Sequence, residues 1–168
     1  MKILIMGLPG SGKTTLAREL SECIDAVWWN ADEVRQYINK HLGFSIEDRL
    51  QQARTMGWVA EQVAKSGSIA VCDFVCPTPE AREAYSEFGP PDLLIWLNTI
   101  DASRFADTNR IFIPPENPDL VIDYFKIVPD DRETQKPEVE TLNRAINEIL
   151  QLIKDKDVEH RLSTNRAV

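Results

Sequence analysis

Glycine, lysine and threonine residues near the N-terminus have the types and spacing needed to hold a polyphosphate. Residues 7–14 read Gly-Leu-Pro-Gly-Ser-Gly-Lys-Thr, which fits G-x-x-x-x-G-K-[ST]. Glycines let backbone N–H groups turn inward around phosphate oxygens, and the N-terminus of a following helix adds partial positive charge. Lys13 is placed to reach the β- and γ-phosphates, and the Thr14 hydroxyl is a ligand for Mg²⁺. The predicted ATP site comprises Gly7, Leu8, Pro9, Gly10, Ser11, Gly12, Lys13, Thr14 and Thr15.

The flanks of this motif distinguish it from a chance glycine-rich turn. An apolar strand is predicted over residues 2–6 and a helix over residues 13–23, which is the context that a phosphate-binding loop requires. Motor ATPases, GTPases and small-molecule kinases all use such a loop. Asn39-Lys40 is followed by His-Leu, so the guanine signature N-K-x-D is missing. The chain is also short for a motor module, and its length favours a kinase.

A second polar cluster follows the predicted strand at residues 26–29. Asp32 is a candidate base for an acceptor hydroxyl, and Arg35 and Arg49 are suited to gripping an anionic acceptor. Phe44 could stack on a flat ring. Alternatively, Asp32 caps the next helix and the arginines form surface ion pairs. Beside a phosphate loop we favour the site, with Lys13, Asp32 and Arg35 as catalytic residues.

Asp73 ends an apolar segment, Ile-Ala-Val-Cys-Asp at residues 69–73, much like a Walker B element. The ends of strands one, two and three are neighbours in a sheet of this class, so Asp73 and Thr14 form the predicted metal site. Asn30 would accept a hydrogen bond from a metal-bound water but brings no charge. The alternative is that Asp73 is a loop or helix-cap aspartate. Proximity of its carboxylate to Thr14 Oγ1 would favour the metal role.

The elements that must position these residues alternate along the chain. Strands are predicted over residues 2–6, 26–29, 68–72 and 93–97, and a fifth within 121–128. Helices are predicted over residues 13–23, 33–40, 79–88 and 139–153, and a long one from a Ser45–Asp48 capping box to Gly67. This order predicts a three-layer α/β sandwich of the P-loop NTPase/kinase class with a five-stranded parallel sheet. The four tryptophans are interpreted as core residues.

Three prolines make residues 100–119 an irregular loop over the site. The predicted division is a kinase domain at residues 1–154, including this loop, and a polar tail at 155–168 that frays.

The composition limits which binding partners and which cellular compartment are expected. The chain has 168 residues, 43% of them hydrophobic, with 19 basic and 27 acidic side chains and a net charge of −8. This balance makes nucleic acid an unexpected partner, because backbone binding needs a basic face. No apolar run approaches a membrane span, residues 1–6 are too short for a signal peptide, and three cysteines do not indicate a disulfide framework. A cytoplasmic protein with a small anionic acceptor is expected, and a homodimer is left open.

Several segments together resemble the adenylylsulfate kinases. They are residues 7–17, Asn-Ala-Asp-Glu-Val-Arg at 30–35, Leu-Gly-Phe-Ser-Ile-Glu-Asp-Arg at 42–49, Phe-Val-Cys-Pro at 74–77 and Pro-Glu-Asn-Pro-Asp-Leu-Val at 115–121. That family uses ATP to phosphorylate the 3′-hydroxyl of adenylylsulfate. The resemblance covers about the first three quarters of the chain. It implies that Asp32 is the base, within an acceptor site made of Asp32, Arg35, Phe44, Arg49, Gln52, Phe74, Val75, Arg104 and Arg110.

The chain departs from the pattern of this family at defined positions. Asn30-Ala31-Asp32 stands where the family usually has Asp-Gly-Asp, Gln52 replaces an Asn, and Cys76 replaces a Ser. The lysine-rich lid is absent, since no Lys occurs between Lys65 and Lys126. Two other functions therefore stay open: a kinase of nucleotide or polynucleotide ends, and an ATP-binding regulatory module with little transferase activity.

Overall fold

Five parallel strands form the central sheet of the protein. The computed structural model describes residues 1–129 and 135–165. The strands are β1 (Lys2–Gly7), β2 (Val27–Asn30), β3 (Ala70–Phe74), β4 (Leu93–Leu97) and β5 (Leu120–Ile122). Their order across the sheet is β2-β3-β1-β4-β5, and every pairing is parallel. The predicted sheet is confirmed, including the adjacency of the ends of strands one, two and three.

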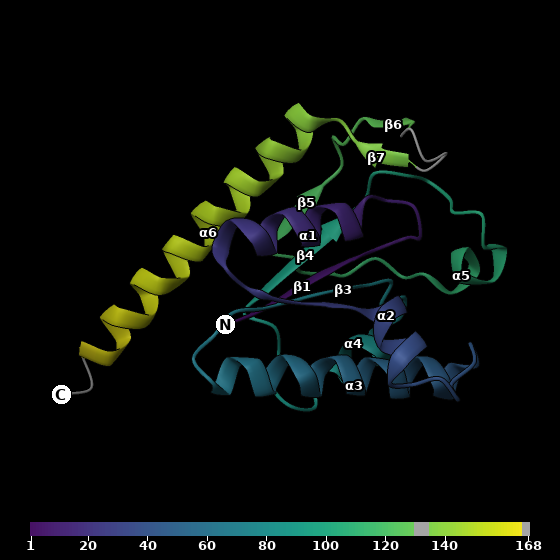
Figure 1. Ribbon diagram of the computed structural model, residues 1–168, viewed down its shortest axis with the longest axis horizontal. Helices are drawn as coiled ribbons and strands as arrows, with labels where there is room; N and C mark the ends of the chain where they lie inside the picture. The colour runs from purple at the N-terminus through teal and green to yellow at the C-terminus, as the bar shows by residue number, and fades with distance from the viewer. Residues whose placement is uncertain (130–134, 166–168) are drawn as a thin grey trace.

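Helices cover both faces of this sheet, which gives the predicted three layers (Figure 1). Helices α1 (Lys13–Ile24) and α6 (Val139–Asn165) lie on one face, and α3 (Ile46–Lys65) and α4 (Pro79–Ser86) lie on the other. The short helix α2 (Ala31–Tyr37) follows β2 directly and contacts α3. Among the described residues, no helix is both long and apolar enough to cross a lipid bilayer.

The core consists of two apolar clusters, one on each face of the sheet. Alternate residues of β1 divide between them, because Ile3 and Ile5 join the cluster under α1 and α6 while Leu4 and Met6 join the cluster under α3 and α4. Both faces of β1 and β4 are covered, which explains why these strands are continuous apolar runs.

Helix α3 carries two of the predicted acceptor residues, and its position is tightly constrained. Its N-terminus has the predicted capping box, in which the Ser45 hydroxyl accepts from the Asp48 N–H and the Asp48 carboxylate accepts from the Ser45 N–H. At Gly57 an added Cβ would lie 2.0 Å from the Tyr85 carbonyl oxygen of α4. The glycine therefore permits the close packing of α3 against α4.

One helix and one two-stranded hairpin that were not predicted from the sequence lie in the second half of the chain. The predicted irregular loop at 100–119 contains the helix α5 (Ala106–Ile111). The segment 121–128 was expected to hold only the fifth strand, but β5 ends at Ile122 and an antiparallel hairpin follows, formed by β6 (Ile127–Pro129) and β7 (Gln135–Pro137). A three-residue strand and a short hairpin leave too little periodicity to be separated by sequence alone.

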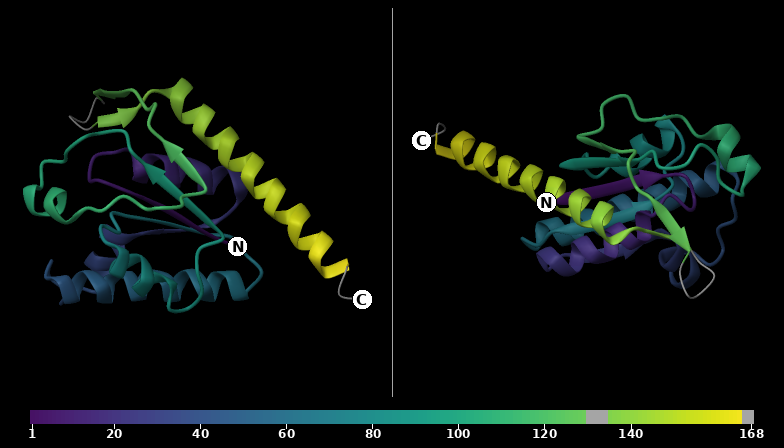
Figure 2. Two further views of the ribbon diagram at one scale, coloured as in Figure 1. Left: turned by 180° about the vertical axis from the view of Figure 1, so that it is seen from behind. Right: turned by 90° about the horizontal axis from the view of Figure 1, so that it is seen from above.

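The last helix is longer than its apolar pattern indicated. Helix α6 continues to Asn165, across the boundary predicted at residue 154, and its C-terminal half extends away from the sheet (Figure 2). The expectation that the chain frays from Asp155 stays a prediction, and residues 166–168 lie outside the described residues. The division into domain and tail stays a prediction, since residue 154 marks no end of an element.

Candidate active site

The phosphate loop joins β1 to α1 at the carboxyl edge of the sheet. Its glycines have positive φ, with 149° at Gly7, 89° at Gly10 and 95° at Gly12. At Gly7 an added Cβ would lie 2.4 Å from the carbonyl oxygen of Leu97 on β4. At Gly12 it would lie 2.9 Å from the Pro137 side chain of the hairpin. The loop conformation therefore requires glycine at these positions.

Several backbone N–H groups of this loop are available to an anion. Within the described part of the chain, the N–H groups of Gly10 and Gly12 have no hydrogen-bond acceptor. Those of the first turn of α1 are unpaired within the helix, as at any helix N-terminus. Thr99 donates a 2.8 Å hydrogen bond to the Ser11 carbonyl oxygen, which ties the loop to the segment after β4. This is a preformed cradle for phosphate oxygens.

Lys13 is buried under the loop that it would serve. Its Nζ donates to the Leu8 carbonyl oxygen at 2.8 Å. Burial lowers the pKa of Lys13 to about 8, and the negative charges of Asp73 and Asp32 oppose that shift. A bound polyphosphate would supply the negative charge that the buried ammonium group lacks.

The Asp73 carboxylate lies where the metal prediction requires it. Its Oδ2 accepts a 2.9 Å hydrogen bond from Thr14 Oγ1, and its Oδ1 accepts a 2.7 Å bond from Trp28 Nε1. Asn30 Nδ2 lies 3.2 and 3.1 Å from the two oxygens. The 2.9 Å bond confirms the predicted proximity of Asp73 to Thr14. Asn30 lies beside Asp73 because the two residues are partners in the register of β2 and β3. Asp73 is therefore neither a loop residue nor a helix cap.

A buried carboxylate next to a hydroxyl suits a hard cation such as Mg²⁺. Asp73 is only 2% exposed, and burial raises the pKa of its carboxyl, while the bonds from Trp28, Thr14 and Asn30 and the charge of Lys13 oppose the increase. Mg²⁺ on a nucleotide typically uses one or two carboxylates, with phosphate and water oxygens completing the shell. The described residues contain no group of three or more His, Cys, Asp or Glu side chains that could hold a metal ion. Asp73 and Thr14 fit the nucleotide-bound ion.

Asn30, and not Asp32, caps helix α2. Asn30 Oδ1 accepts hydrogen bonds from the N–H groups of Asp32 and Glu33, both at 3.0 Å. These two bonds occupy its lone pairs, so the expectation that Asn30 accepts from a metal-bound water is wrong. The Asp32 carboxylate is exposed and has no hydrogen-bond partner among the described residues. The capping interpretation of Asp32 therefore fails, and its side chain is free to meet a ligand.

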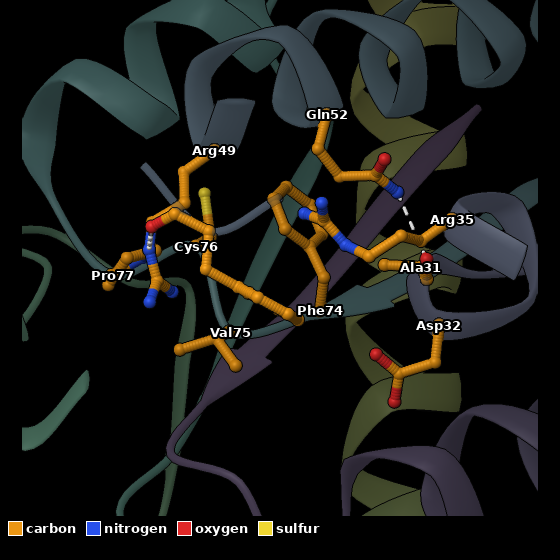
Figure 3. A pocket seen from close by; sticks show the side chains of 10 residues that line it. Ala31, Asp32, Arg35, Arg49, Gln52, Phe74, Val75, Cys76 and Pro77 are labelled. Carbon is orange, nitrogen blue, oxygen red and sulfur yellow. Dashed lines mark hydrogen bonds between the residues drawn. The ribbon is translucent and has the colours of Figure 1, made fainter. Parts of the chain in front are cut away.

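A pocket beside this carboxylate gathers most of the predicted acceptor residues. Arg35, Arg49 and Phe74 all line it, and in Figure 3 the two arginines extend into it from different sides. Two arginines from different helices and an aromatic ring can together hold an anion attached to a flat group. The lining consists of Ala31, Asp32, Arg35, Phe44, Arg49, Gln52, Phe74, Val75, Cys76 and Pro77.

Gln52 lines the pocket, but its amide is already engaged. Its Nε2 donates to the Ala31 carbonyl oxygen at 3.0 Å, and its Oε1 accepts from Asn39 Nδ2 at 2.8 Å. The side chain is 3% exposed. These bonds join α3 to the start of α2, so Gln52 fixes the position of the neighbouring Asp32.

Phe44 lies between the two pocket arginines. Arg35 and Arg49 place their guanidinium carbons 4.7 and 5.5 Å from the centre of its ring, and the ring is 68% exposed. Arg35 also donates to the Leu42 and Gly43 carbonyl oxygens, and Arg49 Nε donates to the Phe44 carbonyl oxygen. The loop before α3 thus orients both arginines.

The loop predicted to lie over the site, at residues 100–119, contributes a residue that was not predicted. Asp107 of α5 accepts a 2.8 Å hydrogen bond from Arg49 Nη2. Arg104 and Arg110 are exposed and do not line the pocket, with Arg104 stacked on Phe105 and Arg110 bonded to the Ala106 carbonyl oxygen. Their predicted acceptor role stays a prediction.

Trp28 is the other site residue that sequence reasoning missed. It was interpreted as core, but its indole N–H bonds Asp73. The available signal was its spacing, because residues two apart on a strand share a face and Asn30 follows at that interval.

Comparison with known proteins is consistent with this arrangement. The family model of adenylylsulphate kinase matches residues 1–95. A probable adenylyl-sulfate kinase of Aeropyrum pernix is 29% identical over 149 residues, which span 72% of this chain and 81% of the relative. The adenylyl-sulfate kinase of Bacillus licheniformis is 31% identical over 147 residues, covering 72% and 75% of the two chains.

Solved structures show the same fold. The Mycobacterium tuberculosis APS kinase CysC, in complex with AMPPNP and APS, has a TM-score of 0.71 at 20% identity and covers 91% of this chain and 96% of its own. Shikimate kinase from Aquifex aeolicus has a TM-score of 0.55 at 15% identity, with coverage of 94% and 99%. The phosphate loop, the pocket residues and the family match together place this chain in the adenylylsulphate kinase family, a group of P-loop kinases that transfer phosphate to a hydroxyl.

Proposed function

We propose that this protein transfers the γ-phosphate of ATP to the 3′-hydroxyl of adenylylsulfate. The observation that carries the proposal is the pocket next to the phosphate loop. It brings together Asp32, Arg35, Phe44, Arg49, Gln52, Phe74 and Val75, which come from four separate segments of the chain. The names of the relatives support the same acceptor.

The phosphate loop and Lys13 would hold the ATP polyphosphate. Mg²⁺, when bound, neutralises charge on the β- and γ-phosphates. Thr14 Oγ1 and Asp73 Oδ2 lie 2.9 Å apart and would hold that ion together, the hydroxyl directly and the carboxylate directly or through a water. Lys13 stays under the loop, where a phosphate oxygen replaces the Leu8 carbonyl oxygen as the acceptor of its hydrogen bond.

Asp32 would accept the proton of the acceptor hydroxyl. Its carboxylate is exposed at the pocket, and the Asn30 cap and the Gln52 amide fix the backbone on which it stands. A base must come within hydrogen-bond reach of the proton that it removes, so a fixed backbone matters. Arg35 and Arg49 would grip the anionic group of the acceptor, while Phe44 and Phe74 offer ring faces to its base.

One contact favours a second function, that of an ATP-binding module with little transferase activity. Asp107 places a carboxylate on Arg49, in the position that the anion of an acceptor would take. The loop around it carries no lysine that could compensate. On this alternative ATP binds, and the acceptor pocket stays closed to anions.

A transfer screen with γ-labelled ATP distinguishes these functions. The acceptors are adenylylsulfate, nucleosides, nucleotides and oligonucleotide ends, and the control is the Lys13→Ala variant. We expect label on adenylylsulfate at a rate well above all other acceptors. Label on oligonucleotide ends would instead identify a polynucleotide kinase, and ATP binding without label on any acceptor would favour the regulatory module.

A further inference from the structure

The indole of Trp28 is directed at the buried carboxylate of Asp73. The 2.7 Å bond from Nε1 to Oδ1 is the shortest of the side-chain contacts that Asp73 makes among the described residues. An indole N–H can only donate, so this bond fixes Oδ1 as an acceptor. A charged acceptor makes the bond stronger than one between neutral groups.

The strand register explains how Trp28 reaches Asp73. Asn30 lies opposite Asp73, and Trp28 lies opposite Val71, two residues earlier on each strand. Residues at this interval point to the same face of a sheet, so Trp28, Asn30 and Asp73 all face the side covered by α1. The large indole spans the distance between the two register positions.

Asn30 Nδ2 lies near both oxygens of Asp73, whereas Trp28 and Thr14 each bond only one of them. Oδ1 accepts from Trp28, while Oδ2 accepts from Thr14 Oγ1. A hydroxyl has one proton and two lone pairs, so Thr14 Oγ1 could meet a cation through a lone pair while it still donates to Oδ2. Oδ2 would then lie beside that cation, and the bond from Trp28 to Oδ1 would keep the carboxylate from rotating.

We infer that Trp28 is a positioning residue of the metal site, which holds Asp73 through Oδ1 so that Oδ2 faces the Mg²⁺ of the bound nucleotide. This inference rests on the proposed metal role of Asp73 and Thr14. The Trp28 ring packs against the apolar cluster under α1 and α6. The inference assigns it a second function in addition to this packing.

The neighbouring Trp29 provides a matched control. It points to the opposite face, where it packs against the cluster under α3 and α4. Its buried Nε1 has no hydrogen-bond partner among the described residues. Replacement of either tryptophan by phenylalanine removes one indole N–H and about the same volume, but only Trp28→Phe removes a bond to Asp73.

The experiment measures Mn²⁺ affinity by electron paramagnetic resonance in the presence of a non-hydrolysable ATP analogue. The chains compared are the parent, Trp28→Phe, Trp29→Phe and Asp73→Asn. We expect Trp28→Phe to weaken Mn²⁺ binding by about 10- to 100-fold, as loss of a partner of a metal ligand typically does. Trp29→Phe should stay within about twofold of the parent. The Mg²⁺ concentration for half-maximal phosphoryl transfer should likewise be higher in Trp28→Phe than in the parent and nearly unchanged in Trp29→Phe.

The outcomes separate the inference from the function on which it rests. Weaker Mn²⁺ binding in Asp73→Asn with unchanged binding in Trp28→Phe would overturn the role of Trp28 alone. Unchanged binding in Asp73→Asn would overturn the metal role of Asp73 and, with it, the inference. The Mn²⁺ affinity is measured without an acceptor, so it does not depend on which acceptor is phosphorylated.

A second measurement uses the parent chain, so it does not depend on whether a variant folds. In the ¹⁵N-labelled parent chain, Mg²⁺ added to the analogue complex should shift the indole N–H resonance of Trp28 and leave that of the half-exposed Trp58 in place. An unmoved Trp28 resonance at saturating Mg²⁺ would refute the coupling between the indole and the metal site.

Discussion

Replacement of Asn30 by Asp tests the pairing between the ends of β2 and β3. Asn30 Nδ2 lies 3.2 and 3.1 Å from the Asp73 oxygens, while Asn30 Oδ1 caps α2. In Asn30→Asp the cap can persist, because a carboxylate oxygen accepts the same two N–H groups. The other oxygen, however, would replace the amide nitrogen next to Asp73.

The electrostatic cost follows from the distance. Two unit charges 3.1 Å apart repel by about 5 kcal/mol at an effective dielectric constant of about 20. The pair can avoid this cost by retaining a proton, which at pH 7 requires about 4 kcal/mol for a carboxyl of ordinary pKa. The free energy of unfolding of Asn30→Asp should therefore fall by up to about 4 kcal/mol at pH 7.

The sign of the pH dependence follows from the same argument. Repulsion raises the pKa of the pair in the folded state above its unfolded value, so the folded state binds more protons. Stability relative to the parent is then lost as pH rises from the unfolded pKa, by about 1.4 kcal/mol per pH unit. Between pH 5 and pH 7 the deficit of Asn30→Asp should grow by about 2–3 kcal/mol.

Urea unfolding of the parent and Asn30→Asp at pH 5 and pH 7 measures this deficit. The matched control is the exchanged pair, Asn30→Asp with Asp73→Asn, which again has one amide and one carboxylate. The exchanged pair should recover most of the stability. It should also recover part of the Mg²⁺ affinity that Asp73→Asn alone loses. A single variant as stable as the parent at both pH values would refute the reasoning.

Three further predictions concern the nucleotide and acceptor sites. Because the pKa of Lys13 is about 8 without nucleotide, ATP binding at pH 8 should be accompanied by the uptake of about half a proton. Calorimetry in buffers of different ionisation enthalpy measures this uptake, and Lys13→Ala should show no uptake and lose most transfer. Asp32→Asn should slow transfer by about 10²- to 10⁴-fold with an unchanged melting temperature, whereas equal loss of both would contradict the catalytic role. Asp107→Asn should lower the KM for the acceptor by up to about fivefold by freeing Arg49, and an unchanged KM would exclude competition at that arginine.

The sheet and the phosphate loop could be predicted from the sequence because their signals are local. The glycine spacing of residues 7–14 admits few backbone paths, and the apolar run at residues 93–97 matches β4 without a shift. The capping box at Ser45 likewise places the start of α3. In each case the residues that determine the element are adjacent in the chain.

The unpredicted features depend on contacts between distant segments. Helix α5 has six residues, with Asp107 paired to Arg49, 58 positions earlier. At Gly12 of the phosphate loop, the atoms nearest to an added Cβ belong to Pro137 of the hairpin and to Phe125, which precedes the hairpin. Such short elements are stabilised by tertiary packing, for which no periodic pattern exists in the sequence.

The proposed metal site shows how a contact between distant residues changes the interpretation of a single substitution. In the sequence alone, an amide at position 30 indicates a weakened metal site, because an amide brings no negative charge. In the structure its oxygen caps α2, and its nitrogen donates to Asp73, so the amide is the one side chain of that size that can serve both groups. A carboxylate at 30 would serve the cap but repel Asp73, whereas a carboxylate at 73 gains donors from both Asn30 and Trp28. In this chain the negative charge next to Thr14 therefore stands on β3, where Thr14, Trp28 and Asn30 all donate hydrogen bonds to it.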